Sequence, residues 1–598
     1  MDKNVIVKRL EQLRNLMRQE RLGAFIFPST DPHNGEYTPD YWKGREFISG
    51  FNGSAGTAVV TLKDAALWTD SRYFIAAEEQ LRGTGFQLMR EKIEGTPTIA
   101  EWIGRKLSES RDTEVGIDGM VNSEDTVEAL KDELRRQGGI TLRTNFDPLE
   151  TLWEERPELP LSVITIQPIA YAGEECSSKI DRIRQSLIAR KASGILVSAL
   201  DDIAWTLNLR GKDVHCTPLF VSYLLITKSR TRLYIDKRKL TKEVSDYLAK
   251  NKVLVSDYND IANDLRDYIG YNLLMDGSET SYTLFNKPDC VKLNQRSPIP
   301  AMKAVKNETE IGGYRKAMLR DGIAMVKFLR WLKSAIETGT QTEISIDRKL
   351  TSFRQSQENY RDLSFDTIAG YEEHGAIVHY EATKETDKRL MPQGLLLLDS
   401  GAQYADGTTD ITRTIALGPV TEEQKHIYTL VLKGHIQLSM LKFPKGASGT
   451  QLDALARKDM WKEGLNYMHG TGHGVGSYLS VHEGPHQIRM EWKPTPLVAG
   501  MTVTNEPGLY LPGRFGVRIE NTMLITPYRE SEFGEFLQLE PLTLCPIDTT
   551  PIDLKMLTAE EVEWLDNYHR HVFDTLSPHL NYLDRDWLAE ATKPLACH

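Results

Sequence analysis

Four stretches of the chain have a hydrophobic pattern that predicts secondary structure directly. Residues 1–20 and 307–337 place apolar side chains at helical spacing, which predicts two amphipathic helices. Residues 558–576 predict a third helix, because Thr558 and Glu561 form a capping-box pattern at its start. Residues 394–401, "GLLLLDSG", are a continuous apolar run of the kind found in buried strands. The chain therefore mixes helices with buried strands.

Two parts of the first half resemble each other. Residues 58–72 align without a gap on residues 224–238, with identical residues at Thr61/Thr227, Leu67/Leu233, Asp70/Asp236 and Arg72/Arg238. Upstream, residues 24–31 match residues 194–201 at nearly the same offset. The repeat is about 170 residues long, which is too long for a solenoid unit. It predicts a duplicated α/β domain of helix, strand and β-hairpin; the alternative is a chance likeness between two ordinary strand pairs.

The chain is too long for one hydrophobic core, because domains usually contain about 100–200 residues. Two proline-containing stretches, residues 153–161 and 296–310, have the composition of linkers. They predict domains at about 1–155, 156–303 and 304–598. The helix at 558–576 is expected to pack on its own domain, with a subunit contact as the alternative.

Composition limits the classes of partner and compartment. The net charge is −11, from 73 basic and 84 acidic residues that are mixed along the chain, so a nucleic-acid partner is not expected. The five cysteines are widely spaced and lack a CxxC motif, which favours a reducing compartment and argues against a thiolate metal site. No apolar run reaches about 18 residues, and residues 1–20 lack the apolar core of a signal peptide. We therefore expect a cytoplasmic protein without a membrane partner.

Histidines are concentrated in one region. Eight of the 14 histidines lie between positions 374 and 486, less than a fifth of the chain. Residues 469–476 read "HGTGHGVG", with His469 and His473 among four glycines. Each glycine inside a helix costs about 1 kcal/mol relative to alanine, so this stretch predicts a loop. It is either an ordinary glycine-rich turn or a loop whose backbone passes close to a group that binds imidazole nitrogens.

A predicted hairpin brings two aspartates together. The Asp-Gly pair at 406–407 is a strong hairpin signal, and it lies between the buried run ending at Asp399 and a strand starting at Asp410. Two like charges across a strand pair destabilise it, and an isolated buried carboxylate tends to take up a proton. A cation would relieve this conflict. The alternative is one exposed aspartate and one that caps the chain locally.

A second predicted hairpin repeats this arrangement. The Pro-Gly pair at 512–513 lies midway between Glu506 and Glu520. Strand alternation places Arg518 on the same face as Glu520. The alternative is that Arg518 simply neutralises Glu520 as a structural ion pair.

The two hairpins and the loop between them supply four carboxylates and a histidine. This set is too rich in oxygen for a single zinc site, and no D-x-D-x-D-G calcium loop is present. Four carboxylates balance two divalent ions, which bridging carboxylates hold about 3.5–4 Å apart. The residues therefore predict two-metal hydrolysis.

Several motifs resemble those of a known family. "LLDSGAQYADGTTDITRT", "HGTGHGVGSYLSVHEGP", "TNEPGLY" and "GVRIEN" resemble the metallopeptidases of the pita-bread fold, in particular the three-domain cytosolic aminopeptidases P, or Xaa-Pro aminopeptidases. "SGFNGSAGTAVV", "LWTDSRYF" and "NLRGKDV" look like their two creatinase-type domains, and "EWLDNYHRHV" resembles their C-terminal extension, here about 545–598. The resemblance implies an α/β and α+β multidomain fold, with two creatinase-type α/β domains before a pita-bread catalytic domain.

The resemblance also implies roles for individual residues. It implies five metal ligands: Asp399, Asp410, His473, Glu506 and Glu520. It implies catalytic roles for His379, His482 and Glu506, and substrate-binding roles for Arg72, His379, His469, His482 and Arg518. Tyr510 and Phe365 are further candidates for the substrate pocket, because an Xaa-Pro bond has no N–H and must be recognised by shape. One departure is visible: Asn505 stands where an aspartate is common in the family.

The activity implied is hydrolysis of the N-terminal Xaa-Pro bond of peptides with proline at position two, by a hydroxide that two metal ions activate. Carboxylate-rich ligands favour Mn²⁺, with Zn²⁺ or Co²⁺ as alternatives. The family analogy also suggests a homodimer. A prolidase acting on Xaa-Pro dipeptides is the main rival, and a non-catalytic peptide-binding relative is the rival from another class. Creatinase uses this fold without metals, so the five intact ligand positions disfavour it. Methionine aminopeptidase is disfavoured because it does not need two leading domains.

Overall fold

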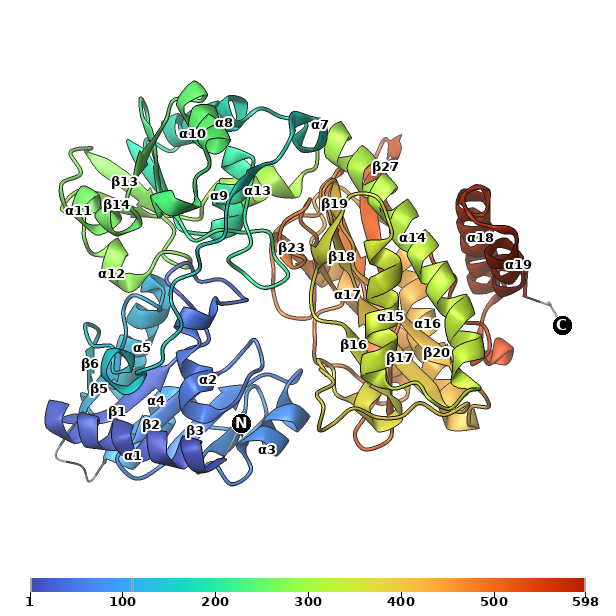
Figure 1. Ribbon diagram of the computed structural model, residues 1–598, viewed down its shortest axis with the longest axis horizontal. Helices are drawn as coiled ribbons and strands as arrows, with labels where there is room; N and C mark the ends of the chain where they lie inside the picture. Colours follow the sequence, from blue (N-terminus) through green and yellow to red (C-terminus); the bar gives the residue numbers. More distant parts are fainter. Residues whose placement is uncertain (1–2, 109, 111, 596–598) are drawn as a thin grey trace. The chain divides into compact units, whose positions relative to one another are not determined.

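The chain folds into two compact units. The computed structural model describes residues 3–108, 110 and 112–595, so Cys597 lies outside the described residues (Figure 1). The N-terminal unit comprises Met1–Ile166 and Glu175–Ile299, and the C-terminal unit comprises Gln167–Glu174 and Pro300–His598. Both halves of the predicted repeat belong to the N-terminal unit.

The N-terminal unit contains two six-stranded sheets, in the orders β4-β3-β2-β1-β5-β6 and β12-β11-β10-β8-β13-β14. The first sheet consists of β1 (Leu22–Phe27), β2 (Thr57–Thr61), β3 (Ala65–Thr69), β4 (Gln87–Arg90), β5 (Glu114–Ile117) and β6 (Thr141–Arg143). The second consists of β8 (Gly194–Val197), β10 (Tyr223–Thr227), β11 (Thr231–Tyr234), β12 (Val253–Ser256), β13 (Asn272–Met275) and β14 (Val291–Asn294). A short pair, β7 (Thr165–Ile166) and β9 (Leu209–Arg210), lies outside these sheets.

The duplication predicted from the sequence is confirmed. In the first sheet, β1 pairs antiparallel with β2 and parallel with β5. In the second sheet, β8 pairs in the same way, antiparallel with β10 and parallel with β13. The aligned Asp70–Arg72 and Asp236–Arg238 pairs also make the same contact, since each arginine donates from Nε and Nη2 to the aspartate two residues before it.

Helices surround both sheets. They are α1 (Lys3–Glu20), α2 (Gly44–Ser49), α3 (Phe74–Leu81), α4 (Ile99–Leu107), α5 (Glu124–Arg136), α6 (Leu149–Leu152), α8 (Cys176–Ala189), α9 (Leu200–Leu207), α10 (Lys242–Lys250), α11 (Ile261–Arg266), α12 (Tyr282–Phe285) and the start of α13 (Ile299–Ala304). As the amphipathic pattern predicted, α1 buries Ile6, Leu10, Leu13 and Met17 in the core of the first sheet.

The C-terminal unit is built on small, strongly paired sheets. Their orders are β15-β18-β19, β16-β17-β20, β21-β28-β27-β24, β22-β23 and β25-β26. The strands are β15 (Tyr360–Leu363), β16 (Ile368–Tyr371), β17 (Leu395–Ser400), β18 (Ala402–Tyr404), β19 (Gly407–Thr408), β20 (Ile411–Ala416), β21 (Lys442–Pro444), β22 (Gly472–Gly474), β23 (Glu483–Ile488), β24 (Thr502–Asn505), β25 (Gly508–Leu511), β26 (Phe515–Arg518), β27 (Asn521–Ser531) and β28 (Gly534–Pro541).

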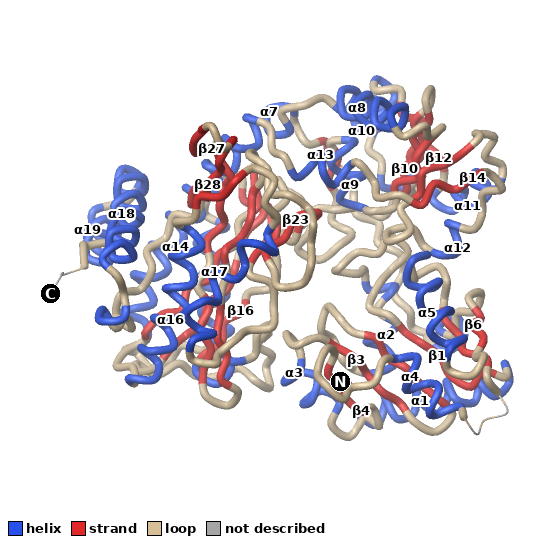
Figure 2. Tube along the Cα trace, turned by 180° about the vertical axis from the view of Figure 1, so that it is seen from behind, coloured by secondary structure: helices blue, strands red, loops and turns tan. Residues whose placement is uncertain are grey.

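The C-terminal unit also contains helices, the longest of which lie beside these strands (Figures 1 and 2). They are α7 (Ile169–Ala172), α14 (Glu308–Ile336), α15 (Glu343–Gln355), α16 (Glu422–Ser439), α17 (Gly449–Lys462), α18 (Ala559–Leu576) and α19 (Tyr582–Ala591). The predicted capping box of Thr558 and Glu561 is present at the start of α18, and the structure shows a further one at Asn307, at the start of α14. Helix α18 packs on its own unit, because Leu565, Val572 and Leu576 share a core cluster with α16.

Two predicted details differ from the structure. The turn of the first hairpin is shifted by one residue, since Tyr404 pairs with Gly407 and the turn is Ala405-Asp406. Tertiary contacts fix this register: Arg320 binds both oxygens of Asp406, and Gln167 donates to the Ala405 carbonyl. The stretch 296–310, predicted as a linker, contains α13.

Gly313 in α14 lies so close to this turn that no side chain fits there. A Cβ at Gly313 would lie 2.2 Å from the carbonyl oxygen of Asp406, whereas one at the neighbouring Gly312 would meet nothing within 4 Å. We expect Gly313→Ala to destabilise the protein by about 1–3 kcal/mol, because the hairpin must move. Gly312→Ala should stabilise it by up to about 1 kcal/mol through helix propensity. Thermal unfolding of the two variants checks this, and equal shifts in Tm would contradict it.

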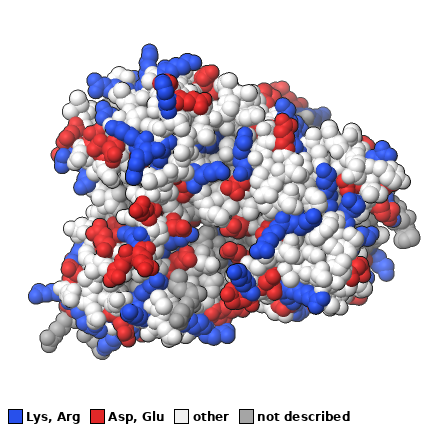
Figure 3. Space-filling model, viewed as in Figure 1, with Lys and Arg blue, Asp and Glu red and all other residues white. Residues whose placement is uncertain are grey.

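The surface carries both signs of charge. On the face shown in Figure 3, basic and acidic side chains are interspersed without one continuous field of either sign. Among the residues that the structure describes, no helix has both the length and the apolar character needed to span a bilayer. None of the four described cysteines is in a disulfide.

Candidate metal centre

Two hairpins and one loop of the C-terminal unit bring together the five residues predicted as ligands. Asp399 lies in β17 and Asp410 directly precedes β20, and these strands pair in register, with Asp399 opposite Thr412. Glu506 follows β24, and Glu520 lies between β26 and β27. The register of both flanking pairs, Asn505↔Asn521 and Gly508↔Arg518, places Glu506 and Glu520 opposite each other.

The ligand atoms of these residues cluster within short distances. Three overlapping groups each have their ligand atoms within 4.8 Å of one another: Asp399–Asp410–Glu520, His473–Glu506–Glu520 and Asp410–His473–His482. His473 Nε2 lies 3.4 Å from Asp410 Oδ2 and 3.3 Å from Glu506 Oε1. The structure therefore places all five residues, and His482, in one site.

The pKa values of these groups show that the site collects negative charge. Burial and the neighbouring Asp399 raise the pKa of Asp410 to about 7, and burial together with Asp410 raises that of Glu520 well above its usual range. Burial opposes charge on His473 and Glu506 as well, but their mutual contact raises the pKa of His473 to about 9 and lowers that of Glu506 to about 2. Without cations, bound protons must limit the charge of the site.

Two observations show that the residues fit divalent cations. Asp399 Oδ1 is buried without a hydrogen-bond partner, while its other oxygen accepts from Arg518. His473 Nδ1 lies 2.9 Å from the Gly474 carbonyl, which leaves Nε2 facing the carboxylates as the remaining ligand atom. Four carboxylates and one imidazole suit a pair of hard or borderline divalent ions.

Arg518 does not neutralise Glu520, so that alternative is wrong. Its Nη2 and Nε donate to Asp399 Oδ2 at 2.7 and 3.1 Å, and the whole residue is buried. Its Nη1 donates to the Tyr510 hydroxyl at 2.6 Å, and Nη2 also reaches the Val378 carbonyl at 3.3 Å. Arg518 therefore links one metal-site carboxylate to the side of the site where His379 follows Val378.

Tyr510 and His469 form the next links of this chain. Because the guanidinium only donates, the Tyr510 oxygen accepts from Arg518 and its proton goes to His469 Nε2, 2.8 Å away. His469 Nδ1 then donates to the Gly470 carbonyl at 2.8 Å. Burial lowers the pKa of His469 to about 4, so the ring is neutral at pH 7. His469 is thus held as a neutral imidazole beside the carboxylates.

The other predicted substrate residues lie in different settings. The His482 ring is 4.5 Å from that of His473, edge to face. His379 and Phe365 are half-buried, His379 in the turn after residues 372–376 and Phe365 before β16. Arg72 belongs to the N-terminal unit, where Asp70 binds its guanidinium at 2.7 and 2.9 Å. Because Arg238 makes the same contact in the second copy, this pair by itself does not mark a substrate residue.

Several residues that hold the site were not found from the sequence. Arg457 donates to the carbonyl of His469 at 3.0 Å and is itself bound by Asp453 at 2.6 Å, which anchors the glycine-rich loop to α17. Asp453 also accepts from the Thr471 hydroxyl. In sequence this is an ordinary i, i+4 helix pair, and only its burial, 1% exposed for each residue, distinguishes it.

Asn505, the departure noted in the sequence, faces away from the carboxylates. Its amide donates to the His435 carbonyl at 2.8 Å and to the Ser439 hydroxyl at 2.9 Å, both in α16. His435 Nδ1 in turn lies 3.1 Å from the Asn505 carbonyl. The residue before Glu506 is therefore fixed to α16 from both its side chain and its backbone.

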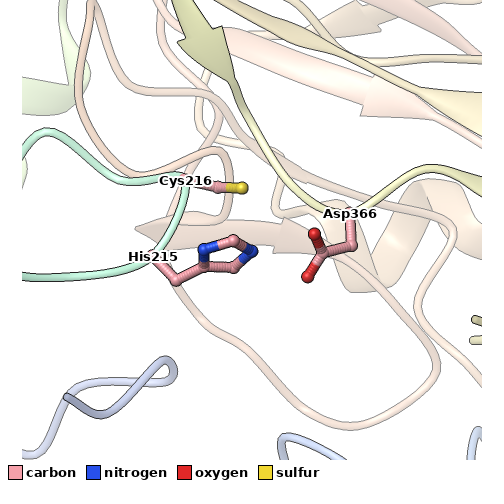
Figure 4. Close-up of side chains that lie close together, drawn as sticks. All are labelled: His215, Cys216 and Asp366. Atoms are coloured by element: carbon pink, nitrogen blue, oxygen red, sulfur yellow. The ribbon is translucent and has the colours of Figure 1, made fainter. Parts of the chain in front are cut away.

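His215 lies outside residues 374–486, the segment in which the histidines are concentrated. Figure 4 draws His215 and Cys216, neighbours in the loop after β9, and Asp366, which precedes β16. Cys216 is buried and has a φ of 56°, so the backbone there is in the left-handed region. His215 and Cys216 are not part of the carboxylate cluster.

Comparison with known proteins gives a concordant result along the chain. Residues 9–149 and 155–310 each match the creatinase/prolidase N-terminal domain, residues 312–527 match metallopeptidase family M24, and residues 535–595 match the C-terminal region of peptidase M24. The chain is 38% identical to aminopeptidase P1 of Arabidopsis thaliana, over 98% of this chain and 99% of that protein. It is also 38% identical to Xaa-Pro aminopeptidase 1 of Dictyostelium discoideum, over 100% and 97%.

A solved structure agrees with these relatives. The X-prolyl aminopeptidase of Caenorhabditis elegans, described as a cytosolic enzyme with a di-nuclear active site, has a TM-score of 0.94 and 34% sequence identity. The match covers 99% of this chain and 100% of that one. The predicted fold class is therefore confirmed. The chain belongs to the Xaa-Pro aminopeptidases of metallopeptidase family M24, with creatinase-type N-terminal domains.

Proposed function

We propose that this protein is a metal-dependent aminopeptidase that removes the first residue from peptides with proline at position two. The observation that carries the proposal is the convergence of four carboxylates and His473 into three overlapping ligand groups within one buried site. Relatives named as Xaa-Pro aminopeptidases or aminopeptidases P cover nearly the whole chain, both N-terminal domains included. This coverage favours the aminopeptidase over the prolidase alternative.

Asp399, Asp410, His473, Glu506 and Glu520 would hold two divalent ions, and the family resemblance implies that Asp410 and Glu520 would be shared between them. Such a pair supplies Lewis acidity that activates water for attack on a carbonyl carbon near neutral pH. Mn²⁺ is proposed because the ligand set is rich in carboxylates, with Zn²⁺ and Co²⁺ as alternatives.

The chain's own side chains perform the proton transfers and the charge stabilisation. Glu506 is proposed to shuttle a proton from the attacking water to the proline nitrogen that leaves, a general acid/base task. His379 is proposed to donate to the oxygen of the scissile carbonyl, where negative charge develops. His482, close to His473, is proposed to donate to the carbonyl that follows proline.

Recognition of proline must depend on shape, because the Xaa-Pro amide has no N–H to donate. His469 and Tyr510 present a rigid hydrogen-bonded wall beside the carboxylates, and Phe365 is proposed as an apolar part of the same pocket. Arg72 is proposed to contact the substrate from the N-terminal unit, and Arg518 to support the site through Asp399.

We also propose a cytoplasmic location and a homodimer. The C. elegans relative is described as cytosolic, which supports the first. The second is supported by the apolar surface that α19 exposes at Tyr582 and Leu583, 69% and 60% exposed. Domain limits near 155 and 303 are proposed on the composition of the two proline-containing stretches, and a limit near 545 is proposed on the resemblance of the C-terminal extension.

Peptidase assays with and without chelator test the proposal. We expect release of the first residue from an Xaa-Pro-Pro tripeptide or longer peptide, loss of at least about 99% of the activity after chelation and dialysis, and recovery with two equivalents of Mn²⁺. An Xaa-Ala-Pro peptide is the matched control and should not be cleaved at its first bond. Cleavage of Xaa-Pro dipeptides alone would identify a prolidase, and activity indifferent to the chelator would refute the metal mechanism.

A further inference from the structure

Asp410 and Glu520 come from different hairpins, whose backbones meet at one isolated bridge. Thr412 pairs with Glu520 in this bridge, outside any continuous strand pair. The Glu520 N–H donates to the Thr412 carbonyl at 3.1 Å, and the Thr412 hydroxyl donates to the Glu520 carboxylate at 2.8 Å. Threonine side chains add links on either side, from Thr522 to the Asp410 carbonyl and from Thr414 to Arg518. The separation of the two carboxylates depends on how firmly this bridge is held.

The guanidinium of Arg413 binds the backbone of both residues of this bridge. Its Nη1 donates both to the Thr412 carbonyl at 2.9 Å and to the Glu520 carbonyl at 2.6 Å. Arg413 is 1% exposed, so water does not compete for these contacts. With the N–H bonded to Thr412 and the carbonyl bonded to Arg413, the peptide groups on both sides of the Glu520 Cα are fixed.

The other side of the guanidinium is bound by the C-terminal region, residues 535–595. Arg413 donates to the carbonyls of Cys545 and Pro546 at 2.8 and 3.0 Å, and to the Tyr568 hydroxyl at 3.0 Å. With Asn521 Oδ1 at 2.8 Å, the six acceptors are four backbone carbonyls and two side-chain oxygens, none of them a carboxylate. The orientation of the guanidinium is therefore set by hydrogen-bond geometry rather than by a counter-charge.

Tyr568 is well placed to set this orientation. Its ring stacks on Trp564 of the same helix, α18, at 5.4 Å and 6°. Because arginine only donates, the Tyr568 oxygen accepts from Arg413, and its proton is available to the carbonyl of Thr543 or Cys545 at 2.9 or 3.0 Å. The residue thus connects α18, the segment before it and Arg413 at one oxygen atom.

We propose that Arg413 and Tyr568 are positioning residues for the metal site, and that the C-terminal region sets the placement of Glu520 relative to Asp410 through them. The inference rests on the proposed function, because it takes Glu520 as a metal ligand. It gives α18 a role in metal binding although none of its residues lies among the ligand groups.

Tyr568→Phe is the central test, because it removes one oxygen and keeps the stacked ring. The matched control is Tyr428→Phe. Tyr428 is buried in the same core cluster, and its hydroxyl donates to the Asp548 carbonyl at 2.6 Å rather than to an acceptor on Arg413 or Glu520. Metal-free full-length proteins are titrated with Mn²⁺ against a chromophoric chelator, and their thermal unfolding and peptidase kinetics are measured in parallel.

We expect Tyr568→Phe to weaken binding of at least one Mn²⁺ by roughly 10–100-fold, as for other partners that orient ligands. Its kcat should fall while KM is nearly unchanged. Tyr428→Phe should lower the Tm of the metal-free protein by a similar amount and bind two Mn²⁺ as the wild type does. Arg413→Lys should act in the same direction as Tyr568→Phe and more strongly, because one ammonium cannot reproduce the planar fork of donors.

The outcomes separate this inference from the proposed function. Wild-type Mn²⁺ affinity in Tyr568→Phe, or an equal loss of affinity in Tyr568→Phe and Tyr428→Phe, would overturn the positioning role alone. A wild-type protein that binds no Mn²⁺ would overturn the proposed function together with this inference.

Discussion

Asp410→Asn is expected to prevent the protein from binding two metal ions and to lower kcat/KM by at least about a thousandfold. This loss exceeds the roughly 10–100-fold that is typical of residues that only orient ligands. Asp410 belongs to two of the three ligand groups, so its loss affects both halves of the site. A neutral amide has nearly the same shape but cannot balance cationic charge. Bound metal, measured by mass spectrometry, should fall below two ions per chain.

The matched control for this variant is Asp406→Asn, in the turn of the same hairpin. Arg320 binds the Asp406 carboxylate at 2.6 and 2.8 Å, and Asp406 is not a member of any ligand group. The control should lose stability while it keeps its metal and more than about a tenth of its kcat/KM. Equal loss of metal in both variants would show that the hairpin, rather than the Asp410 carboxylate, accounts for the effect.

The same variant should change how the stability of the metal-free protein depends on pH. Burial and Asp399 raise the pKa of Asp410 from 3.8 to about 7, so between these pH values the folded state binds more protons than the unfolded state. The free energy of unfolding must then fall as pH rises through this window. In Asp410→Asn the fall should be smaller, as measured by urea unfolding with chelator at pH 5 and pH 7.5. Identical slopes in the two proteins would contradict this expectation.

Arg354→Met is expected to destabilise the C-terminal unit by about 3–5 kcal/mol, the largest stability effect predicted for a single side chain here. Arg354 of α15 is fully buried and donates from Nε and Nη2 to the two oxygens of Asp321 in α14, at 2.9 and 3.0 Å. Removal of the guanidinium leaves a carboxylate with 4% exposure and only the Tyr404 hydroxyl, at 3.1 Å, as a remaining donor.

A double-mutant cycle isolates the cause of this effect. Arg354→Met combined with Asp321→Leu should be more stable than Arg354→Met alone, because an apolar pair replaces an unpaired buried charge. Arg348→Met, at an exposed position of the same helix, should shift stability by less than about 0.5 kcal/mol. A double variant that is less stable than the single one would refute the charge argument and favour a packing defect.

Local signals in the sequence were sufficient for the elements that carry the site. The Pro-Gly signal predicted a hairpin whose strands β25 and β26 pair with Leu511 opposite Phe515. The Asp-Gly signal predicted the other hairpin but missed its turn by one residue, because Arg320 and Gln167 hold a different register from elsewhere in the unit. The capping box of Thr558 and Glu561 located the start of α18, because its two partners lie within four residues, and apolar side chains at helical spacing located α14.

Contacts between distant segments could not be predicted in this way. The same-face rule paired Arg518 with Glu520, whereas the folded chain brings Arg518 to Asp399, 119 residues away. The helix predicted at 558–576 likewise gave no sign that the hydroxyl of Tyr568, in α18, accepts from Arg413, 155 residues away. Periodicity reports which face of an element is buried, but not which polar partner it meets there.

The amino-acid sequence by itself determined the duplicated α/β halves, the two carboxylate-bearing hairpins and the chemical type of the ligands, because strand alternation, turn residues and side-chain charge are local properties. Tertiary structure alone decided which oxygen of Asp399 stays without a partner, which imidazole nitrogen of His473 faces the carboxylates, and how Arg413 ties Glu520 to the C-terminal region. The choices at Asp399 and Arg413 depend on burial and on hydrogen bonds between segments more than 100 residues apart, and such contacts exist only once the chain has folded.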